Sequence, residues 1–206
     1  MLRSDIINNF IKKYDYKSYL EIGYGNGDTF HKVSIPMADK IGVDGGNGTP
    51  LSDPYVTRMK ADEYFALNKK FTQKTFDIIF IDASHLWEDV YNDLTNALDC
   101  LNEGGTIVMH DCNPPSKPWQ ERQQSPEVPG WTGDTWKAFV KFRTEREDLE
   151  MYVVDTDYGC GVVRTGTQDL LNLTPAEVLD YDLFEPNKQE WLNLCTVEQF
   201  LQRMKN

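Results

Sequence analysis

A short apolar run that leads into closely spaced glycines constrains the fold of this 206-residue chain more than any other feature. The run at 19–22 is followed by glycines at 23, 25 and 27, and Asp28 then stands where a helix could begin. Glycine accepts a positive φ and lets a ligand approach the main chain closely. The pattern predicts a strand, a tight turn and a helix start, which is typical of sites for a nucleoside-bearing cofactor.

The acids beside this turn favour a cationic ligand. Glu21 precedes the glycines and Asp28 follows them, in a G-x-G-x-G spacing that differs from the dinucleotide-binding G-x-G-x-x-G. A pyrophosphate at this helix start would meet negative charge, whereas an amine or a sulfonium would be attracted. S-adenosylmethionine (SAM) carries both groups and is therefore the cofactor that we expect.

Alternating apolar strands and amphipathic helices predict an α/β fold. Strands are expected at 19–22, 40–44, 56–60, 76–82 and 106–111, followed by an antiparallel pair at 151–155 and 161–164. Helices are expected to begin at Ser4, Asp28, Asp62, Leu86 and Asp134 or Thr135, and the helix from Leu86 is expected to stop at Gly104 and Gly105. This order predicts a Rossmann-like three-layer sandwich with a mostly parallel, seven-stranded sheet.

Composition along the chain predicts its organisation. Residues 1–165 are expected to form the cofactor-binding domain, and 166–206 a C-terminal helical extension packed on it. The segment 45–54 is too rich in glycine and proline for a helix and is expected to be a loop. The segment 112–135 is rich in proline and tryptophan, and we interpret it as an ordered loop on the acceptor side. Three tryptophans lie in this segment or just after it: Trp119, Trp131 and Trp136. They either stack on an acceptor or pack the loop onto the domain.

Acidic residues end the predicted strands or follow them closely. They are Glu21, Asp44, Asp62, Asp82 and Asp111. Ligands of parallel sheets bind at the carboxyl ends of the strands, and an acid at the position of Asp44 suits ribose hydroxyls. His85 follows Asp82 closely and is a candidate general base, although it could instead cap a helix. Asp82 and Asp111 could share a divalent cation, or face solvent without one.

Together these motifs resemble class I SAM-dependent methyltransferases. The shared pattern is Glu-x-Gly-x-Gly-x-Gly at 21–27, acids after the next two strands, and Phe-Asp-x-x-Phe-Ile-Asp at 76–82 followed by Gly-Gly and a strand. The segments 81–94 and 101–111 are similar to small-molecule O-methyltransferases of the macrocin type, which act on macrolide sugars.

The resemblance implies a role for each matching residue. Gly23, Gly25 and Gly27 would line the methionine part of SAM, with Glu21 and Tyr24 beside the cofactor. Asp44 would bind the ribose and Asp62 the adenine amino group, and Asp82 would also border the cofactor. Asp82 and Asp111 would ligate Mg²⁺, and His85 would take the hydroxyl proton. The family commonly has a second acid beside Asp111, where this chain offers His110 or Cys112, and His110 is our candidate third ligand.

Charge and composition exclude several other classes of function. The formal net charge of −12 argues against nucleic acid or an anionic membrane as the main partner. No apolar run is long enough to span a membrane, and the four cysteines have no paired metal spacing. We expect a cytoplasmic enzyme with a small-molecule acceptor such as a sugar, and a homodimer is a candidate assembly. The alternatives are an NAD or nucleotide-sugar enzyme on the same fold, and a non-catalytic methyltransferase-like binding module.

Overall fold

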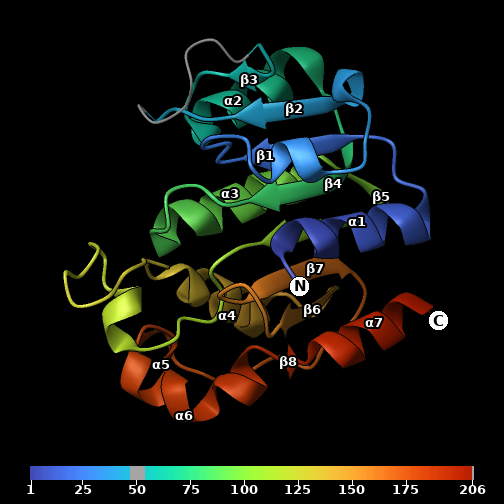
Figure 1. The fold of residues 1–206 in the computed structure, drawn as a ribbon. Helices are drawn as coiled ribbons and strands as arrows, with labels where there is room; N and C mark the ends of the chain where they lie inside the picture. The colour runs from blue at the N-terminus through green and yellow to red at the C-terminus, as the bar shows by residue number, and fades with distance from the viewer. Residues whose placement is uncertain (47–53, 206) are drawn as a thin grey trace.

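A single eight-stranded sheet organises the computed structural model, which describes residues 1–46 and 54–205 (Figure 1). The strands lie in the order β3-β2-β1-β4-β5-β7-β6-β8. They are β1 (Tyr19–Ile22), β2 (Lys40–Val43), β3 (Val56–Thr57), β4 (Phe76–Ile81), β5 (Leu101–Met109), β6 (Leu149–Val154), β7 (Cys160–Thr165) and β8 (Leu194–Cys195). From β3 to β5 all neighbours are parallel, whereas β7 is antiparallel to both β5 and β6.

Helices cover both faces of the sheet. The α-helices are α1 (Arg3–Tyr14), α2 (Ala61–Leu67), α3 (Trp87–Asp99), α4 (Thr135–Glu145), α5 (Pro175–Val178), α6 (Tyr181–Trp191) and α7 (Val197–Lys205). Short helical turns are η1 (Phe30–Lys32), η2 (Met37–Asp39), η3 (Asn68–Thr72) and η4 (Lys117–Gln120). Helices α1 and α7 pack with η1 on one face, and α2 to α6 pack on the other. The result is the three-layer sandwich that the sequence predicts.

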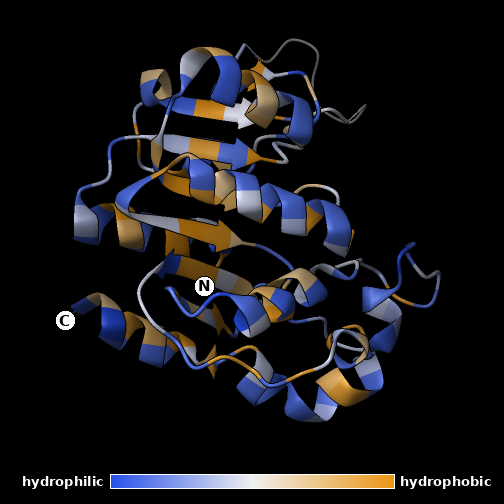
Figure 2. Ribbon diagram, turned by 180° about the vertical axis from the view of Figure 1, so that it is seen from behind, coloured by the Kyte–Doolittle hydropathy of each residue, from blue (hydrophilic) through white to orange (hydrophobic). Residues whose placement is uncertain are grey.

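Strand β4 shows why the middle of the sheet is apolar throughout. Its residues Ile79 and Ile81 belong to the core beneath α3 and α4, while Ile78 and Phe80 belong to the core beneath α1. Because successive side chains of a strand point to opposite faces, a strand covered on both sides needs an unbroken apolar run. Figure 2 shows the central strands coloured as hydrophobic and the helices with hydrophilic residues among apolar ones.

The predicted fold class is confirmed, and the number of strands is corrected from seven to eight. The extra strand, β8, lies within the C-terminal stretch that we expected to be helical, and it pairs with β6. A two-residue strand between helices is too short to show a period of its own. The three helices of this stretch share the same two cores as the rest of the chain.

Several predicted boundaries were wrong. Helix α1 begins at Arg3 with Leu2 at its N-cap, so Ser4 lies inside the helix. Asp28 does not begin a helix, because only the short turn η1 forms, from Phe30. Strand β5 begins at Leu101 and runs through Gly104 and Gly105, while α3 has already ended at Asp99. Most of the predicted loop at 45–54 lies outside the described residues.

Three further observations concern Trp136, the cysteines and the possibility of a membrane-spanning helix. Trp136 does not face an acceptor, because it is fully buried in α4 and stacks on Phe184 at 4.0 Å. All four cysteines are free and buried. None of the helices in residues 1–46 and 54–205 is both long enough and apolar enough to cross a membrane.

Candidate active site

A cavity of about 890 Å³ opens where the parallel strands β1, β2, β4 and β5 end. Parallel neighbours end at one edge of a sheet, so residues distant in sequence meet there. Nearly all of the predicted site residues line this cavity: Glu21, Gly23, Tyr24, Gly25, Asp44, Asp62, Asp82, His85, His110 and Asp111. Gly27 is the exception, since it is not part of the lining.

Gly23 joins the end of β1 to the segment after β4. Its φ is 93°, and a Cβ at this position would lie 2.0 Å from the carbonyl oxygen of Asp82. The Gly23 N–H donates to the Val43 carbonyl of β2 at 2.9 Å, and the Asp82 N–H donates to the Ile22 carbonyl at 2.8 Å. A side chain at position 23 would therefore push apart the two strand ends that form the cavity floor.

Asp44 fixes the glycine turn from the end of β2. Its carboxylate accepts hydrogen bonds from the backbone N–H groups of Gly25 and Gly46, each at 2.6 Å. Gly25, by contrast, has open space where a Cβ would stand. Gly27 serves packing instead, because a Cβ there would strike the hydroxyl group of Tyr24. The turn thus offers the backbone of Gly25 without a side chain, and the Gly25 N–H helps to orient the neighbouring Asp44 carboxylate.

Glu21 is buried in the floor of the cavity. Only 1% of its surface is exposed, and its carboxyl group accepts a hydrogen bond from the Tyr19 hydroxyl. Burial, together with the nearby charge of Asp82, raises the pKa of Glu21 to about 8. At neutral pH this carboxyl group is mostly protonated, and an approaching cation would favour its ionised form.

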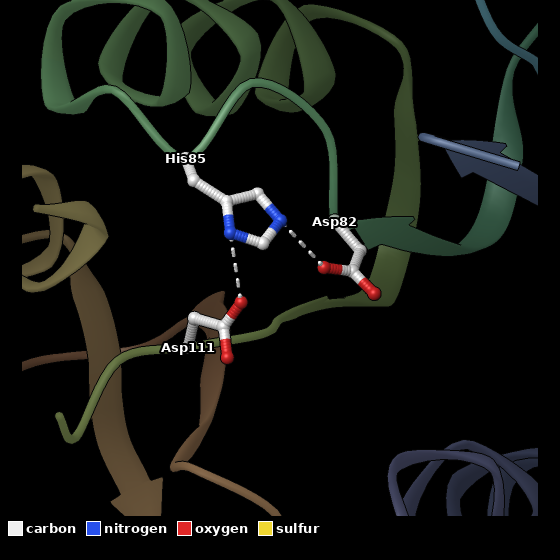
Figure 3. Close-up of side chains that lie close together, drawn as sticks. All are labelled: Asp82, His85 and Asp111. Carbon is white, nitrogen blue, oxygen red and sulfur yellow. Dashed lines mark ion pairs between the residues drawn. The ribbon is translucent and has the colours of Figure 1, made fainter. Parts of the chain in front are cut away.

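Asp82, His85 and Asp111 form a compact cluster at the edge of the sheet (Figure 3). The His85 ring lies between the two carboxylates, with Nε2 3.4 Å from Asp82 Oδ1 and Nδ1 3.2 Å from Asp111 Oδ2. His85 and Asp111 both have a φ of 60°, a left-handed conformation that is strained for residues other than glycine. Such strain gathers at functional sites, where the surrounding structure holds it in place.

Opposite charges set the protonation of this cluster. Burial alone would lower the pKa of His85, but the carboxylates of Asp82 and Asp111 outweigh it and raise that pKa. Burial alone would raise the pKa of Asp82, but His110, His85 and Arg3 lower it. Asp82 is therefore ionised at neutral pH, and its charge favours a proton on His85.

The segment 112–135 holds His85 from the other side. The Trp131 ring stacks on the His85 ring with centroids 5.1 Å apart and an interplanar angle of 16°. The Asp134 N–H donates to the His85 carbonyl at 3.0 Å, and Asp134 Oδ1 accepts from the Trp87 N–H at 2.8 Å. Gly133 makes this contact possible, because a Cβ there would lie 2.0 Å from the His85 carbonyl oxygen. The loop thus fixes both the backbone and the ring of His85.

Arg3 and Asp157 are site residues that the sequence did not reveal. Arg3 Nη1 donates to Asp82 Oδ2 at 2.8 Å and lies 2.9 Å from His110 Nδ1, while Arg3 Nε lies 3.1 Å from Asp157 Oδ2. His110 Nδ1 is also 3.1 Å from Asp111 Oδ1. These contacts join the first helix, β4, β5 and the turn after β6. No local motif could have indicated them, since they depend on how distant segments pack.

An aromatic pair stands beside this cluster. Trp119 and Tyr158 both line the cavity, and their rings stack with centroids 5.1 Å apart. The predicted acceptor-side loop therefore contributes Trp119 and Trp131 to the cavity wall. Tyr158 comes from the turn between β6 and β7, which had no functional prediction.

The Asp82–His85–Asp111 cluster has the donor set of a divalent-cation site. One ligand atom from each of the three residues lies within 4.8 Å of the other two. His85 Nδ1 is buried and has no hydrogen bond of acceptable geometry within the described part of the chain, which suits a metal ligand. His110 is not in this group, although its Nδ1 lies 3.3 Å from Asp82 Oδ1. Its assignment as a ligand stays a prediction.

Comparison with known proteins finds a domain model that matches part of the chain and solved structures that share its fold. A family model described as a methyltransferase domain matches residues 39–112. The O-methyltransferase TomG from Streptomyces achromogenes, solved with SAM, is 13% identical, with 79% of each chain covered and a TM-score of 0.59. The O-methyltransferase from Bacillus cereus, solved with SAH, is 13% identical over 78% of this chain and 79% of its own, with a TM-score of 0.53.

A third similar structure is a putative caffeoyl-CoA O-methyltransferase from Staphylococcus aureus. It is 16% identical, with 79% of this chain and 82% of its own covered and a TM-score of 0.56. None of the curated proteins matches this sequence. At these identities the solved structures establish a shared fold, and the matched segment runs from β2 to the residues just after β5. That segment contains the whole Asp82–His85–Asp111 cluster.

Proposed function

We propose that this protein is a class I SAM-dependent methyltransferase that methylates a hydroxyl oxygen of a small polar acceptor such as a sugar. One observation carries the proposal. The glycine turn with its acids and the Asp82–His85–Asp111 cluster line the same cavity. A positively charged methyl donor and a group that can take a proton would therefore meet in one space.

The glycine-turn end of the cavity suits the cofactor. Gly23 and Gly25 would let the methionine part approach the backbone, and Glu21 would ionise beside its amino group. Each carboxylate oxygen of Asp44 accepts one backbone N–H and can accept a second hydrogen bond from a ribose hydroxyl. Asp62 stands at the start of α2 for the adenine amino group. These assignments follow the residues implied by the family resemblance.

At the other end of the cavity, His85 would accept the hydroxyl proton. The acceptor oxygen forms a bond to the methyl carbon while the carbon–sulfur bond breaks, and S-adenosylhomocysteine (SAH) leaves as a neutral thioether. The hydroxyl proton passes to the neutral form of His85, and Asp82 and Asp111 stabilise the resulting imidazolium through their charges. Stacking on Trp131 keeps the ring in place during this transfer.

A divalent cation such as Mg²⁺ would be held by Asp82 and Asp111, with His85 Nδ1 as a nitrogen donor. When bound, such an ion would lower the pKa of the acceptor hydroxyl. Arg3 pairs with Asp82 Oδ2, while Oδ1 lies 3.3 Å from His110 Nδ1 and 3.4 Å from His85 Nε2, so an ion at Asp82 would replace one of these contacts. If Nδ1 of His85 binds the ion, Nε2 is the nitrogen of this ring that remains to take the hydroxyl proton.

Calorimetric titration with SAH and a turnover assay test the proposal together. We expect wild-type protein to bind SAH and not NAD, and His85→Ala to retain SAH affinity while turnover falls about 100-fold or more. Absence of SAH binding would refute the cofactor assignment. Unchanged turnover in His85→Ala and in Asp82→Asn would refute the catalytic assignment and favour another base.

A further inference from the structure

Asp93 is a buried acid on the cavity wall that the reaction described above does not use. It lies in α3, only 5% of its surface is exposed, and it lines the cavity. Its carboxyl group forms no hydrogen bond or ion pair with any side chain or backbone group that the structure describes. Because the carboxyl group opens onto the cavity, a ligand that fills the cavity would supply its hydrogen-bond partner.

The groups that face Asp93 are acids that already have partners. Asp89, one turn earlier in α3, accepts a hydrogen bond from the Ser84 hydroxyl at 2.5 Å. Asp62, at the start of α2, accepts from the Glu63 N–H at 2.9 Å. Lys60 also lines the cavity but makes no ion pair with Asp93. Among residues 1–46 and 54–205, no group of this wall donates to the Asp93 carboxyl group.

The surroundings also affect which form Asp93 adopts. Burial, and then the charges of Asp89 and Asp62, raise the pKa of Asp93 to about 7. Near neutral pH both forms are present, and the protonated form offers one donor beside one acceptor. This is the pattern that a carboxamide also presents, and it complements a heterocycle edge with an acceptor nitrogen next to an amino group.

We propose that Asp93 recognises the adenine base of the cofactor, with both oxygens of its carboxyl group facing the edge formed by N1 and the 6-amino group. The inference rests on the proposed function, because it takes SAM as the ligand. Asp62 reaches the cavity from α2 and Asp93 from α3, so each hydrogen of the amino group would have its own acceptor. Asp93 would thereby make the site selective for adenine among purines.

Substitutions separate this role from a structural one. Asp93→Asn keeps one donor and one acceptor, so SAH affinity is expected to stay within about threefold of wild type. Asp93→Ala removes both and is expected to weaken SAH binding about tenfold or more. Asp99→Asn is the matched control. Asp99 is in the same helix but is exposed, pairs with Lys69 and does not line the cavity.

The experiment is calorimetric titration of each variant with SAH and with its purine analogue, which lacks the 6-amino group. Wild type should prefer SAH, Asp93→Ala should lose part of that preference, and Asp99→Asn should retain it. Circular dichroism checks folding, and Asp93→Ser replaces Asp93→Ala if the latter does not fold. Equal SAH affinity in wild type and the truncated variant, or an unchanged preference, would overturn the role of Asp93. Absence of SAH binding to wild type would instead overturn the proposed function.

Discussion

Replacing Arg3 tests whether the first helix is part of the site. Its guanidinium group contacts Asp82 at 2.8 Å and Asp157 at 3.1 Å, and 29% of the side chain is exposed. Arg3→Met keeps the aliphatic stem but leaves two carboxylates without this cation. Breaking a fully buried ion pair costs about 3–5 kcal/mol, and the partial exposure here reduces that to about 2 kcal/mol.

This free energy converts into a measurable shift in melting temperature. For a domain of this size, each 1 kcal/mol moves Tm by about 2–4 °C, so Arg3→Met should lower Tm by about 4–8 °C. Asp157→Asn should lower Tm less in the Arg3→Met variant than in wild type, because Arg3 and Asp157 interact directly. Thermal denaturation of the two single variants and the double variant measures this coupling.

Arg203→Met is the control, since Arg203 forms an exposed ion pair with Glu150 at 2.9 Å. Exposed pairs contribute little, so its Tm should change by less than about 2 °C. The reasoning fails if Arg3→Met has the same Tm as wild type, or if the changes in Tm caused by Arg3→Met and Asp157→Asn are fully additive. Turnover of Arg3→Met should also fall, because Asp82 would lose its orienting partner.

Two further predictions concern Trp131, which stacks on the His85 ring, and Glu21 in the floor of the cavity. Trp131→Leu should lower kcat about threefold to tenfold and leave SAH affinity unchanged. The reason is that the stacked Trp131 ring contributes about 0.5–1.5 kcal/mol to holding the His85 ring in position. Equal losses in kcat and in SAH affinity would contradict this. Glu21→Gln should flatten the dependence of stability on pH. The pKa of Glu21 is about 8 in the folded state against an ordinary value of 4.5, so the folded state holds the proton to higher pH and the free energy of unfolding falls as pH rises between these values. Chemical denaturation of wild type between pH 5 and 8 should show a fall of up to about 4 kcal/mol that Glu21→Gln lacks, and parallel curves would refute the assignment.

The meeting of the strand-end acids could be predicted from the sequence for a geometric reason. Glu21, Asp44, Asp82 and Asp111 each stand at or just after the end of a parallel strand, and such ends share one edge of the sheet. Correct recognition of the strands and of their parallel order was enough to bring these residues together. Errors of one to five residues in boundaries, as at the start of β5, did not change which side chains meet.

The remaining features depend on packing between segments with no local signal. Arg3 reaches Asp82 only because α1 packs on one face of the sheet with its N-terminus beside the strand ends, and Trp131 reaches His85 only because Gly133 admits a close backbone contact. In the sequence, Asp93 cannot be told apart from other polar residues of an amphipathic helix, because the cavity beside it forms only in the folded chain. Its burial without a partner is a property of the folded chain, which no spacing rule expresses.

The two ends of the cavity are built from different kinds of structure, and this difference bears on specificity. The end that we propose for the cofactor is formed by the backbone of β1, β2 and β4 and the glycine turn, where hydrogen bonds of the sheet fix the geometry. The part of the cavity wall that we propose for the acceptor consists of Trp119 and Trp131 of the loop at 112–135 and Tyr158 of the turn after β6. Loops accept substitution more readily than a buried parallel sheet does. Changes in the loop should therefore alter which acceptor is methylated while SAH affinity stays constant, whereas changes such as Gly23→Ala should abolish both.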